Sequence, residues 1–130
     1  MFLYLNTAVK EKIIVSLIKN QEPIFNIEKK VKFHQSEKIL ELIDKILHDN
    51  KFSLKDIKGI VVIKGPGSFT AIRVGVTVAN TLAWSLNIPV LGFKLDQSVD
   101  FLKFKNKKLK LVEPFYNQAP NISKSKKPWK

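Results

Sequence analysis

Residues 59–70, Gly-Ile-Val-Val-Ile-Lys-Gly-Pro-Gly-Ser-Phe-Thr, are the stretch that decides the fold. Its first six residues form a short, largely apolar run, which is typical of a strand buried on both faces of a sheet. The Gly-Pro-Gly that follows cannot continue the strand and predicts a sharp turn. Ser68 or Thr70 can then cap a helix over about residues 69–87. A strand, a turn and a helix in this order predict an α/β domain.

The helix predicted after this turn has an unusual outer face. Arg73 is its only charged residue, whereas a surface helix normally presents several charges to water. A position inside a larger core would explain this pattern, but a small domain leaves little room for an internal helix. We therefore favour contact with a partner. On this helix the predicted contact residues are Val74, Val78, Thr81, Trp84 and Ser85.

Three strands and an amphipathic helix are predicted upstream. Residues 2–9 and 12–18 are rich in apolar and β-branched side chains and predict two strands joined by a tight turn. Residues 24–33 alternate loosely, and Pro23 with nearby charges predicts an edge strand. Residues 36–49 place apolar side chains on one arc of a helical wheel. From that arc we add three residues to the predicted partner contact, Ile39, Ile43 and Ile46.

The remaining elements complete one sheet. Residues 88–93 predict a fifth strand, and Asp96 is expected to cap a short helix that ends near Phe104. The order β-β-β-α-β-α-β predicts a mixed five-stranded sheet with helices packed on it. This is the topology of a single lobe of the actin-like, or ribonuclease H-like, fold. We expect the lobe to span residues 1–95, and residues 96–130 to form a short helix and an extended Lys-rich tail.

The composition favours a soluble, cytoplasmic protein. Hydrophobic residues make up 45% of the 130 residues, enough for a packed core. The sequence contains no Cys, which excludes disulfides and thiolate metal sites and fits a reducing compartment. We expect no secretory signal, because no basic segment precedes the apolar residues 1–9. We expect no membrane contact, because no apolar run approaches the roughly 20 residues of a membrane helix.

The net charge of +12 is concentrated near the C-terminus. Residues 1–93 hold 13 basic and 8 acidic residues, whereas residues 94–130 hold 10 Lys and 3 acidic residues. Contact with a polyanion such as RNA would explain this excess, and so would a solvated tail without a ligand. The residues that we predict for a tRNA contact are Lys124, Lys126, Lys127 and Lys130.

The Gly-rich turn is the sharpest chemical motif. Backbone N–H groups at the start of a helix can bind a phosphate, but the P-loop spacing and its Lys are absent. A tight turn with capping hydroxyls is the simpler interpretation, and an anion site at residues 65–70 is the alternative. His34 and His48 lie near opposite ends of one predicted helix, about 21 Å apart, and cannot share a metal. We predict no catalytic residue and no metal site.

A family resemblance arises at this motif. Gly65-Pro66-Gly67-Ser68-Phe69-Thr70, with Arg73 three residues further on, resembles the GPGSFTGxR signature of the TsaB (YeaZ) family. The resemblance covers residues 2–95 nearly without gaps. It includes Leu5-Asn6-Thr7-Ala8, the segment that opens at His34, and Ile88-Pro89-Val90-Leu91-Gly92.

Three departures from the family pattern have consequences. Ala71 stands where the family usually has Gly, and a methyl group there would crowd a close partner backbone. Asn6 stands where the family usually has Asp, which removes a possible metal ligand. Val112-Glu113-Pro114-Phe115-Tyr116 resembles the family's C-terminal Glu-Pro-x-Tyr segment. Typical members carry a second lobe before that segment, so the resemblance implies a shortened member that lacks most of the second lobe. Because actin-like enzymes bind nucleotide between two lobes, we expect no complete nucleotide site in this chain.

The resemblance implies a non-catalytic scaffold subunit that binds a TsaD-like catalytic subunit through its helices. The family's complex also includes a TsaE-like ATPase. ATP and metal are expected on the partner subunits, so no cofactor is expected in this chain. The complex transfers a threonylcarbamoyl group to the tRNA adenosine next to the anticodon, and tRNA is expected to reach this chain through the complex. A homodimer of the isolated chain through the same face stays open.

Two other functions stay open. One is a stand-alone nucleotide- or anion-binding module that uses the loop from Gly65 to Thr70, for which calorimetry with ATP is the test. The other is a small protein that binds RNA alone, although the chain lacks the interleaved aromatic and basic residues of an RNA-recognition sheet.

Overall fold

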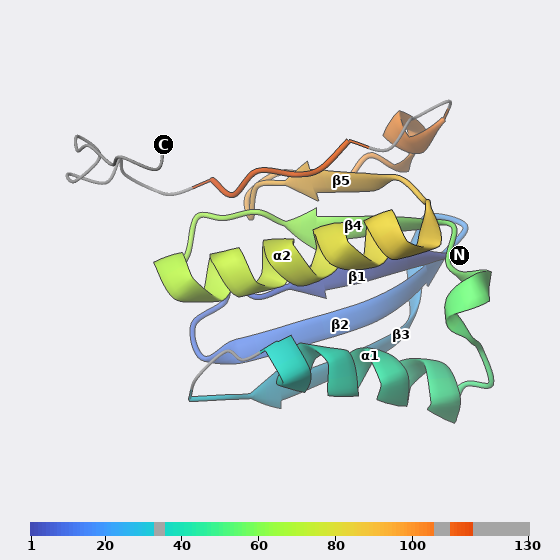
Figure 1. Ribbon diagram of the computed structural model, residues 1–130, viewed down its shortest axis with the longest axis horizontal. Helices are drawn as coiled ribbons and strands as arrows, with labels where there is room; N and C mark the ends of the chain where they lie inside the picture. The colour runs from blue at the N-terminus through green and yellow to red at the C-terminus, as the bar shows by residue number, and fades with distance from the viewer. Residues whose placement is uncertain (33–35, 106–109, 116–130) are drawn as a thin grey trace.

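A five-stranded sheet with two helices on one face forms the core of the computed structural model, which describes residues 1–32, 36–105 and 110–115 (Figure 1). In chain order the elements are β1 Phe2–Asn6, β2 Lys12–Lys19, β3 Glu22–Lys30, α1 Ser36–Asp49, β4 Gly59–Ile63, α2 Phe69–Leu86 and β5 Val90–Phe93. Single 3-10 turns, η1 and η2, occupy Leu54–Asp56 and Phe101–Phe104.

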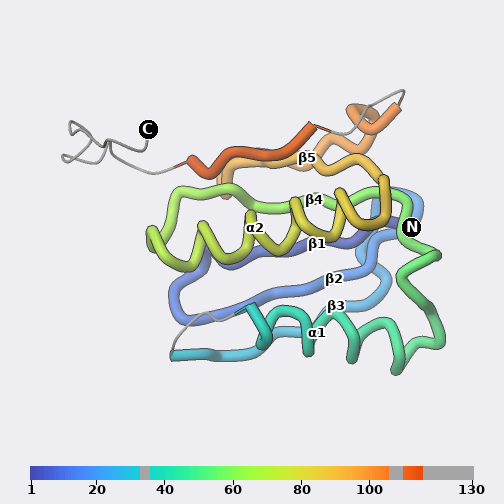
Figure 2. Tube along the Cα trace, viewed as in Figure 1, coloured from blue at the N-terminus to red at the C-terminus, as the bar shows by residue number. Residues whose placement is uncertain are grey.

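The sheet is mixed, as predicted. Its strand order is β3-β2-β1-β4-β5, with antiparallel pairing of β1 to β2 and of β2 to β3. The pairs β1–β4 and β4–β5 are parallel, because α1 and α2 each return the chain to the same end of the sheet. Both helices lie on the same side of the strands (Figure 2). This arrangement confirms the single α/β lobe of the actin-like type.

The core lies between the helices and the central strands. Leu3 pairs in register with Leu17 on one side and Ile60 on the other, and all three side chains are fully buried. Every residue of β4 is buried, as the short apolar run predicted for a strand covered on both faces. β3 is largely exposed and forms an edge. Pro23 pairs there with Ile18, next to a register shift, where an edge strand tolerates a missing N–H.

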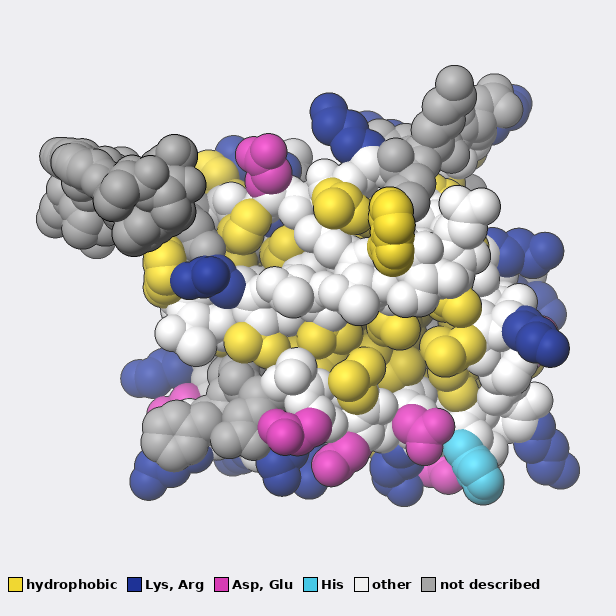
Figure 3. Space-filling model, viewed as in Figure 1, with side chains coloured by type: hydrophobic (Ala, Val, Ile, Leu, Met, Phe, Trp, Pro, Cys, Tyr) yellow, Lys and Arg dark blue, Asp and Glu magenta, His cyan; other side chains and the backbone are white. Residues whose placement is uncertain are grey.

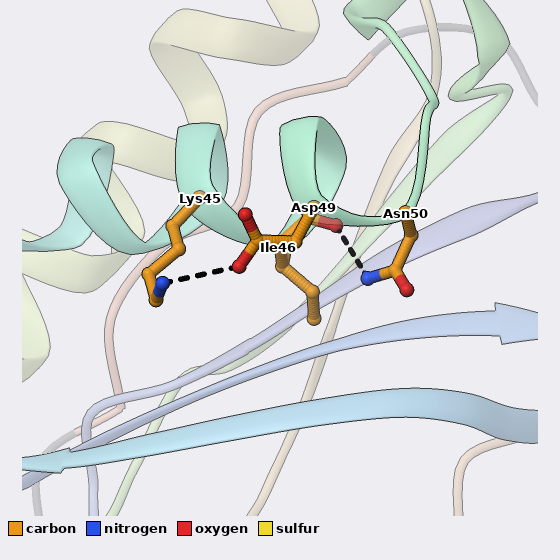
Figure 4. Close-up of polar contacts among 4 residues, drawn as sticks. All are labelled: Lys45, Ile46, Asp49 and Asn50. Carbon is orange, nitrogen blue, oxygen red and sulfur yellow. Dashed lines mark hydrogen bonds and ion pairs between the residues drawn. The ribbon is translucent and has the colours of Figure 1, made fainter.

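Local contacts mark the C-terminal end of α1 and both ends of α2. Lys45 and Asp49 form an exposed ion pair of 3.1 Å in the last turn of α1, and the Asn50 amide donates to the Ile46 carbonyl at 2.7 Å (Figure 4). The N-cap of α2 is Ser68, whose hydroxyl accepts from the Ala71 N–H at 3.4 Å. α2 stops at Asn87, which adopts the left-handed conformation with φ 55°.

The predicted helix after β5 is wrong in its start and its type. Asp100, not Asp96, is the cap, because its carboxylate accepts from the Leu102 N–H at 3.0 Å. The helical part is only the 3-10 turn η2. Two aromatic rings anchor this turn, since Phe104 stacks on Phe2 with ring centroids 4.6 Å apart and Phe101 lies 5.4 Å from the same ring.

Residues 110–115, which we call the strap, run alongside β5 (Figures 1 and 2) and contact both β5 and α2. The side chain of Asn80 on α2 accepts from the Val112 N–H and donates to the Val112 carbonyl, both at 2.9 Å. The Phe115 N–H donates to the Lys64 carbonyl at 2.7 Å. The strap thus attaches this part of the predicted tail to the lobe. Residues 116–130, the rest of that tail, lie outside the described residues.

Replacing Asn80 by Leu is expected to lower the free energy of unfolding by about 1–3 kcal/mol, because both backbone groups of Val112 lose their partner. Denaturant unfolding measures this change. Thr81→Ala, at the exposed neighbouring position, serves as the control and is expected to stay within about 0.5 kcal/mol of the unsubstituted chain. Equal stability of both variants would show that the strap contributes nothing to the fold.

Candidate functional site

The motif loop, Gly65–Thr70, is held by the strap. Gly65 has φ 125°, and a Cβ atom on it would overlap the carbonyl oxygen of Phe115. The Gly65 carbonyl itself accepts from the Leu95 N–H at 2.8 Å. Lys94 places its ammonium group 4.2 Å from the centre of the Phe115 ring, a cation–π contact. The strap and the residues after β5 therefore fix the backbone at which α2 begins.

A second group of contacts joins the end of β1 to the first turns of α2. The Thr7 hydroxyl is buried and donates to the Ala71 carbonyl at 2.8 Å, and Gly75 leaves the space that the Thr7 side chain fills. Ala71 is itself buried within the chain. The expectation that its methyl group would crowd a partner was therefore wrong, since this side of the helix faces the protein's own sheet.

The Asn6 side chain forms hydrogen bonds within the lobe. Its amide nitrogen donates to the Tyr4 hydroxyl at 3.2 Å, and its oxygen accepts from the Ala8 N–H at 2.9 Å. Burial raises the pKa of the Tyr4 phenol above its ordinary value. The buried Asn6 side chain thus shapes the turn after β1.

A hollow of about 490 Å³ lies beside the motif loop. Two cations, Lys10 and Lys32, and one carboxylate, Glu11, line it together with backbone of the loop. The Ser68 hydroxyl caps α2, so the motif serves here as the predicted tight turn with a capping hydroxyl. Within residues 1–32, 36–105 and 110–115, no three His, Asp or Glu side chains gather as a metal site would require.

The predicted partner contact divides into exposed and buried residues. Ile39, Ile43 and Ile46 of α1, and Val78 of α2, lie in the core. The prediction that these four residues contact a partner was therefore wrong, because they already pack in the core of the lobe. The side chain of Ile46, for example, points toward the strands (Figure 4). Val74 is half-buried, whereas the other predicted residues of α2, Thr81, Trp84 and Ser85, are exposed.

Two apolar side chains of this surface were missed by the sequence analysis. Leu40 of α1 is 45% exposed and Phe69 of α2 is 50% exposed, while Trp84 reaches 71%. We use the name helix face for Leu40 of α1 together with seven outer residues of α2, which are Phe69, Arg73, Val74, Thr77, Thr81, Trp84 and Ser85. Hydrophobic side chains gather along the seam between α1 and α2, with charged side chains on the outer side of α1 (Figure 3). Leu40 belongs to the apolar arc of its helix, which was the available signal.

The four Lys residues predicted for tRNA contact, Lys124, Lys126, Lys127 and Lys130, lie outside the described residues, as does His34. Neither α1 nor α2, nor any other helix in the described part of the chain, has the length and apolar character needed to cross a membrane.

Comparison with known proteins shows which proteins this lobe is similar to. A family model described as TsaD, tRNA N6-adenosine threonylcarbamoyltransferase, matches residues 28–94, a little over half of the chain. The tRNA threonylcarbamoyladenosine biosynthesis protein TsaB of Bacillus subtilis is 38% identical over 76 residues, which are 58% of this chain and 33% of that protein. A crystallised YeaZ from Pseudomonas aeruginosa has 25% identity and a TM-score of 0.65 over 72% of this chain and 43% of its own. The chain belongs to the TsaB (YeaZ) family.

The family match concerns part of each relative. A TsaB of Buchnera aphidicola from Acyrthosiphon pisum aligns over 96 residues at 33% identity, which cover 43% of its length. The chain thus spans between about a quarter and about two fifths of the length of TsaB relatives that it matches. The tRNA N6-adenosine threonylcarbamoyltransferase of Vesicomyosocius okutanii aligns over a shorter stretch, 56 residues at 44% identity. Of the proteins named here, those with the longer alignments and the solved structure are TsaB (YeaZ) proteins.

Proposed function

We propose that this TsaB-family chain is a non-catalytic scaffold subunit that binds a TsaD-like catalytic subunit through the helix face. In that role it supports threonylcarbamoylation of the tRNA adenosine next to the anticodon. The family relation supports the process, since its relatives are named as tRNA threonylcarbamoyladenosine biosynthesis proteins. We place the chain in the cytoplasm, where tRNA is modified.

The exposed Trp84 is the observation that carries this proposal. Its side chain is 71% exposed on a helix whose single charge is Arg73. A large aromatic residue in water is costly, and aromatic residues dominate the binding energy of protein interfaces. Leu40 of α1 and Phe69 of α2 are further exposed apolar side chains on the two helices, which lie on the same side of the sheet (Figure 1). A partner that covers these side chains removes their apolar surface from water, at about 25 cal/mol per Å².

The contacts of the motif residues within the lobe support a scaffold role rather than a catalytic one. Asn6 and Thr7 are buried and hydrogen-bonded within the lobe, and Ser68 caps α2. Their polar groups stabilise the turn that sets the direction of α2. ATP and metal are accordingly proposed to bind to the partner subunits, with a TsaE-like ATPase joining the same assembly.

Co-expression with the TsaD protein of the same organism tests the proposal. A tag on this chain is expected to co-purify TsaD at a stoichiometric ratio, and the pair is expected to modify tRNA when the remaining components are added. The isolated chain, measured by sedimentation, is expected to self-associate more weakly than it binds TsaD. Failure to recover TsaD, together with tight binding of ATP by the isolated chain, would favour the nucleotide-binding alternative.

The basic tail is proposed to hold tRNA within the complex. Removal of residues 117–130 is expected to weaken tRNA binding and to reduce the slope of log K against log salt by about 3, because four Lys are lost. The measurement is tRNA binding by the complex between 50 and 200 mM salt, a range in which phosphate contacts respond strongly. The full-length chain with all four Lys changed to Gln is expected to behave in the same way. Unchanged affinity and slope in both would reject the contact.

A further inference from the structure

Arg73 sits in a hollow at the N-terminal end of the helix face. The hollow has a volume of about 350 Å³ and is lined by Ser36 of α1 and by Phe69, Thr70, Val74 and Thr77 of α2. The Arg73 guanidinium lies 5.6 Å from the centre of the Phe69 ring. It is the only charged group between Phe69 and Leu86. A planar cation therefore rests on an aromatic ring in an otherwise uncharged surface.

No carboxylate of the lobe, as far as the structure describes it, neutralises this cation. The ion pairs that form are Lys12–Glu28 at 3.3 Å and Lys45–Asp49 at 3.1 Å, and neither involves Arg73. In the free chain water solvates the guanidinium. Once a partner covers the helix face, that water is displaced, and an unpaired buried charge is strongly destabilising.

On the basis of the proposed function, we infer that the partner that covers the helix face supplies a side-chain carboxylate to the Arg73 guanidinium. The guanidinium presents two parallel N–H groups, which match the two oxygens of a carboxylate. Arg73 and Trp84 lie on the same stripe of α2, three turns and about 16 Å apart. The partner surface is thus apolar where it packs on Trp84 and carries an Asp or Glu about 16 Å away.

The surroundings favour this occupant over two others. Phe69 and Val74 make the hollow partly apolar, and Arg73 is the sole cation among its described lining residues, which suits a single carboxylate better than a phosphate. The chain carries a net charge of +12. Two copies of it repel each other, whereas a partner that is acidic at this position attracts it. A different protein with a carboxylate on an apolar surface therefore fits better than RNA or a second copy.

Calorimetric titration of TsaD into Arg73 variants of the full chain tests the inference. Arg73→Glu and Arg73→Ala are expected to weaken binding by about 30-fold or more, with a smaller loss for Arg73→Lys, which keeps the charge but not the planar fork. Lys55→Glu makes the same change in net charge at an exposed site on η1 and is the matched control. It is expected to change the Kd by less than about twofold. An Asp or Glu of TsaD changed to Arg is expected to restore binding to Arg73→Glu.

The outcomes separate this inference from the proposed function. If Trp84→Glu abolishes TsaD binding while Arg73→Glu leaves the Kd within twofold, the carboxylate is overturned and the scaffold role stands. Equal losses for Arg73→Glu and Lys55→Glu would also overturn it, since net charge would then be the cause. If Arg73→Glu lowers only self-association, or only tRNA binding, the occupant is a second copy or RNA and the inference fails. If TsaD does not bind the unsubstituted chain at all, the proposed function fails first.

Discussion

Trp84→Glu is expected to abolish the binding of TsaD and the modification of tRNA that depends on it, while the chain stays folded. Trp84 is 71% exposed, so the substitution removes no contact of the core. Truncation of a central aromatic side chain commonly costs an interface about 2–4 kcal/mol. The new carboxylate adds the cost of an unpaired charge in the covered surface. We therefore expect at least a 100-fold rise in the Kd, measured by calorimetry.

Leu102→Glu is the matched control for this experiment. The exposed fraction of Leu102, 69%, is close to the 71% of Trp84, but Leu102 lies on η2 and not on the helix face. Its replacement makes the same change from a large apolar side chain to a carboxylate and is expected to leave TsaD binding within twofold. Thermal melting of both variants checks that each is folded. Full tRNA modification by a complex that contains Trp84→Glu would refute the scaffold proposal.

Gly65→Ala is expected to lower the free energy of unfolding by about 3 kcal/mol or more. The backbone of Gly65 has φ 125°, a conformation that L-residues rarely adopt, and the added methyl group would overlap the Phe115 carbonyl oxygen. Relief of the overlap requires the strap to move, which breaks the hydrogen bond from the Phe115 N–H to the Lys64 carbonyl. A domain of this size is expected to lose about 10 °C or more in Tm.

Asn87→Ala separates the two causes. Asn87 also has a positive φ, 55°, but it is exposed at the C-terminal end of α2, away from the strap. The substitution is expected to cost about 1 kcal/mol, the usual penalty of left-handed backbone. If Gly65→Ala costs no more than Asn87→Ala, the steric contact with the strap has no energetic weight.

The local sequence patterns determined the elements of this protein. The apolar run of β4, the Gly-Pro-Gly turn and the capping Ser68 each act on near neighbours in the chain, so their consequences were predictable without a fold. The mixed character of the sheet followed as well, because two antiparallel steps and two helical crossovers combine both kinds of strand pairing. The charge-poor outer face of α2 was visible in the same way, through Trp84 and Thr81.

Only the tertiary structure decided which apolar residues stay at the surface. In α1, Ile39 and Leu40 are neighbours on one apolar arc, yet Ile39 is fully buried and Leu40 is 45% exposed. A helical wheel cannot separate them, because the width of the arc that the sheet covers depends on how the helix sits on it.

The same limit applies to contacts between distant residues. Asn80 holds the backbone of Val112, and Thr7 bonds to the Ala71 carbonyl. The local sequence around these residues does not predict either pair. Periodicity reports which side of an element is apolar, whereas the partner of a buried polar group is set by where the folded chain brings it.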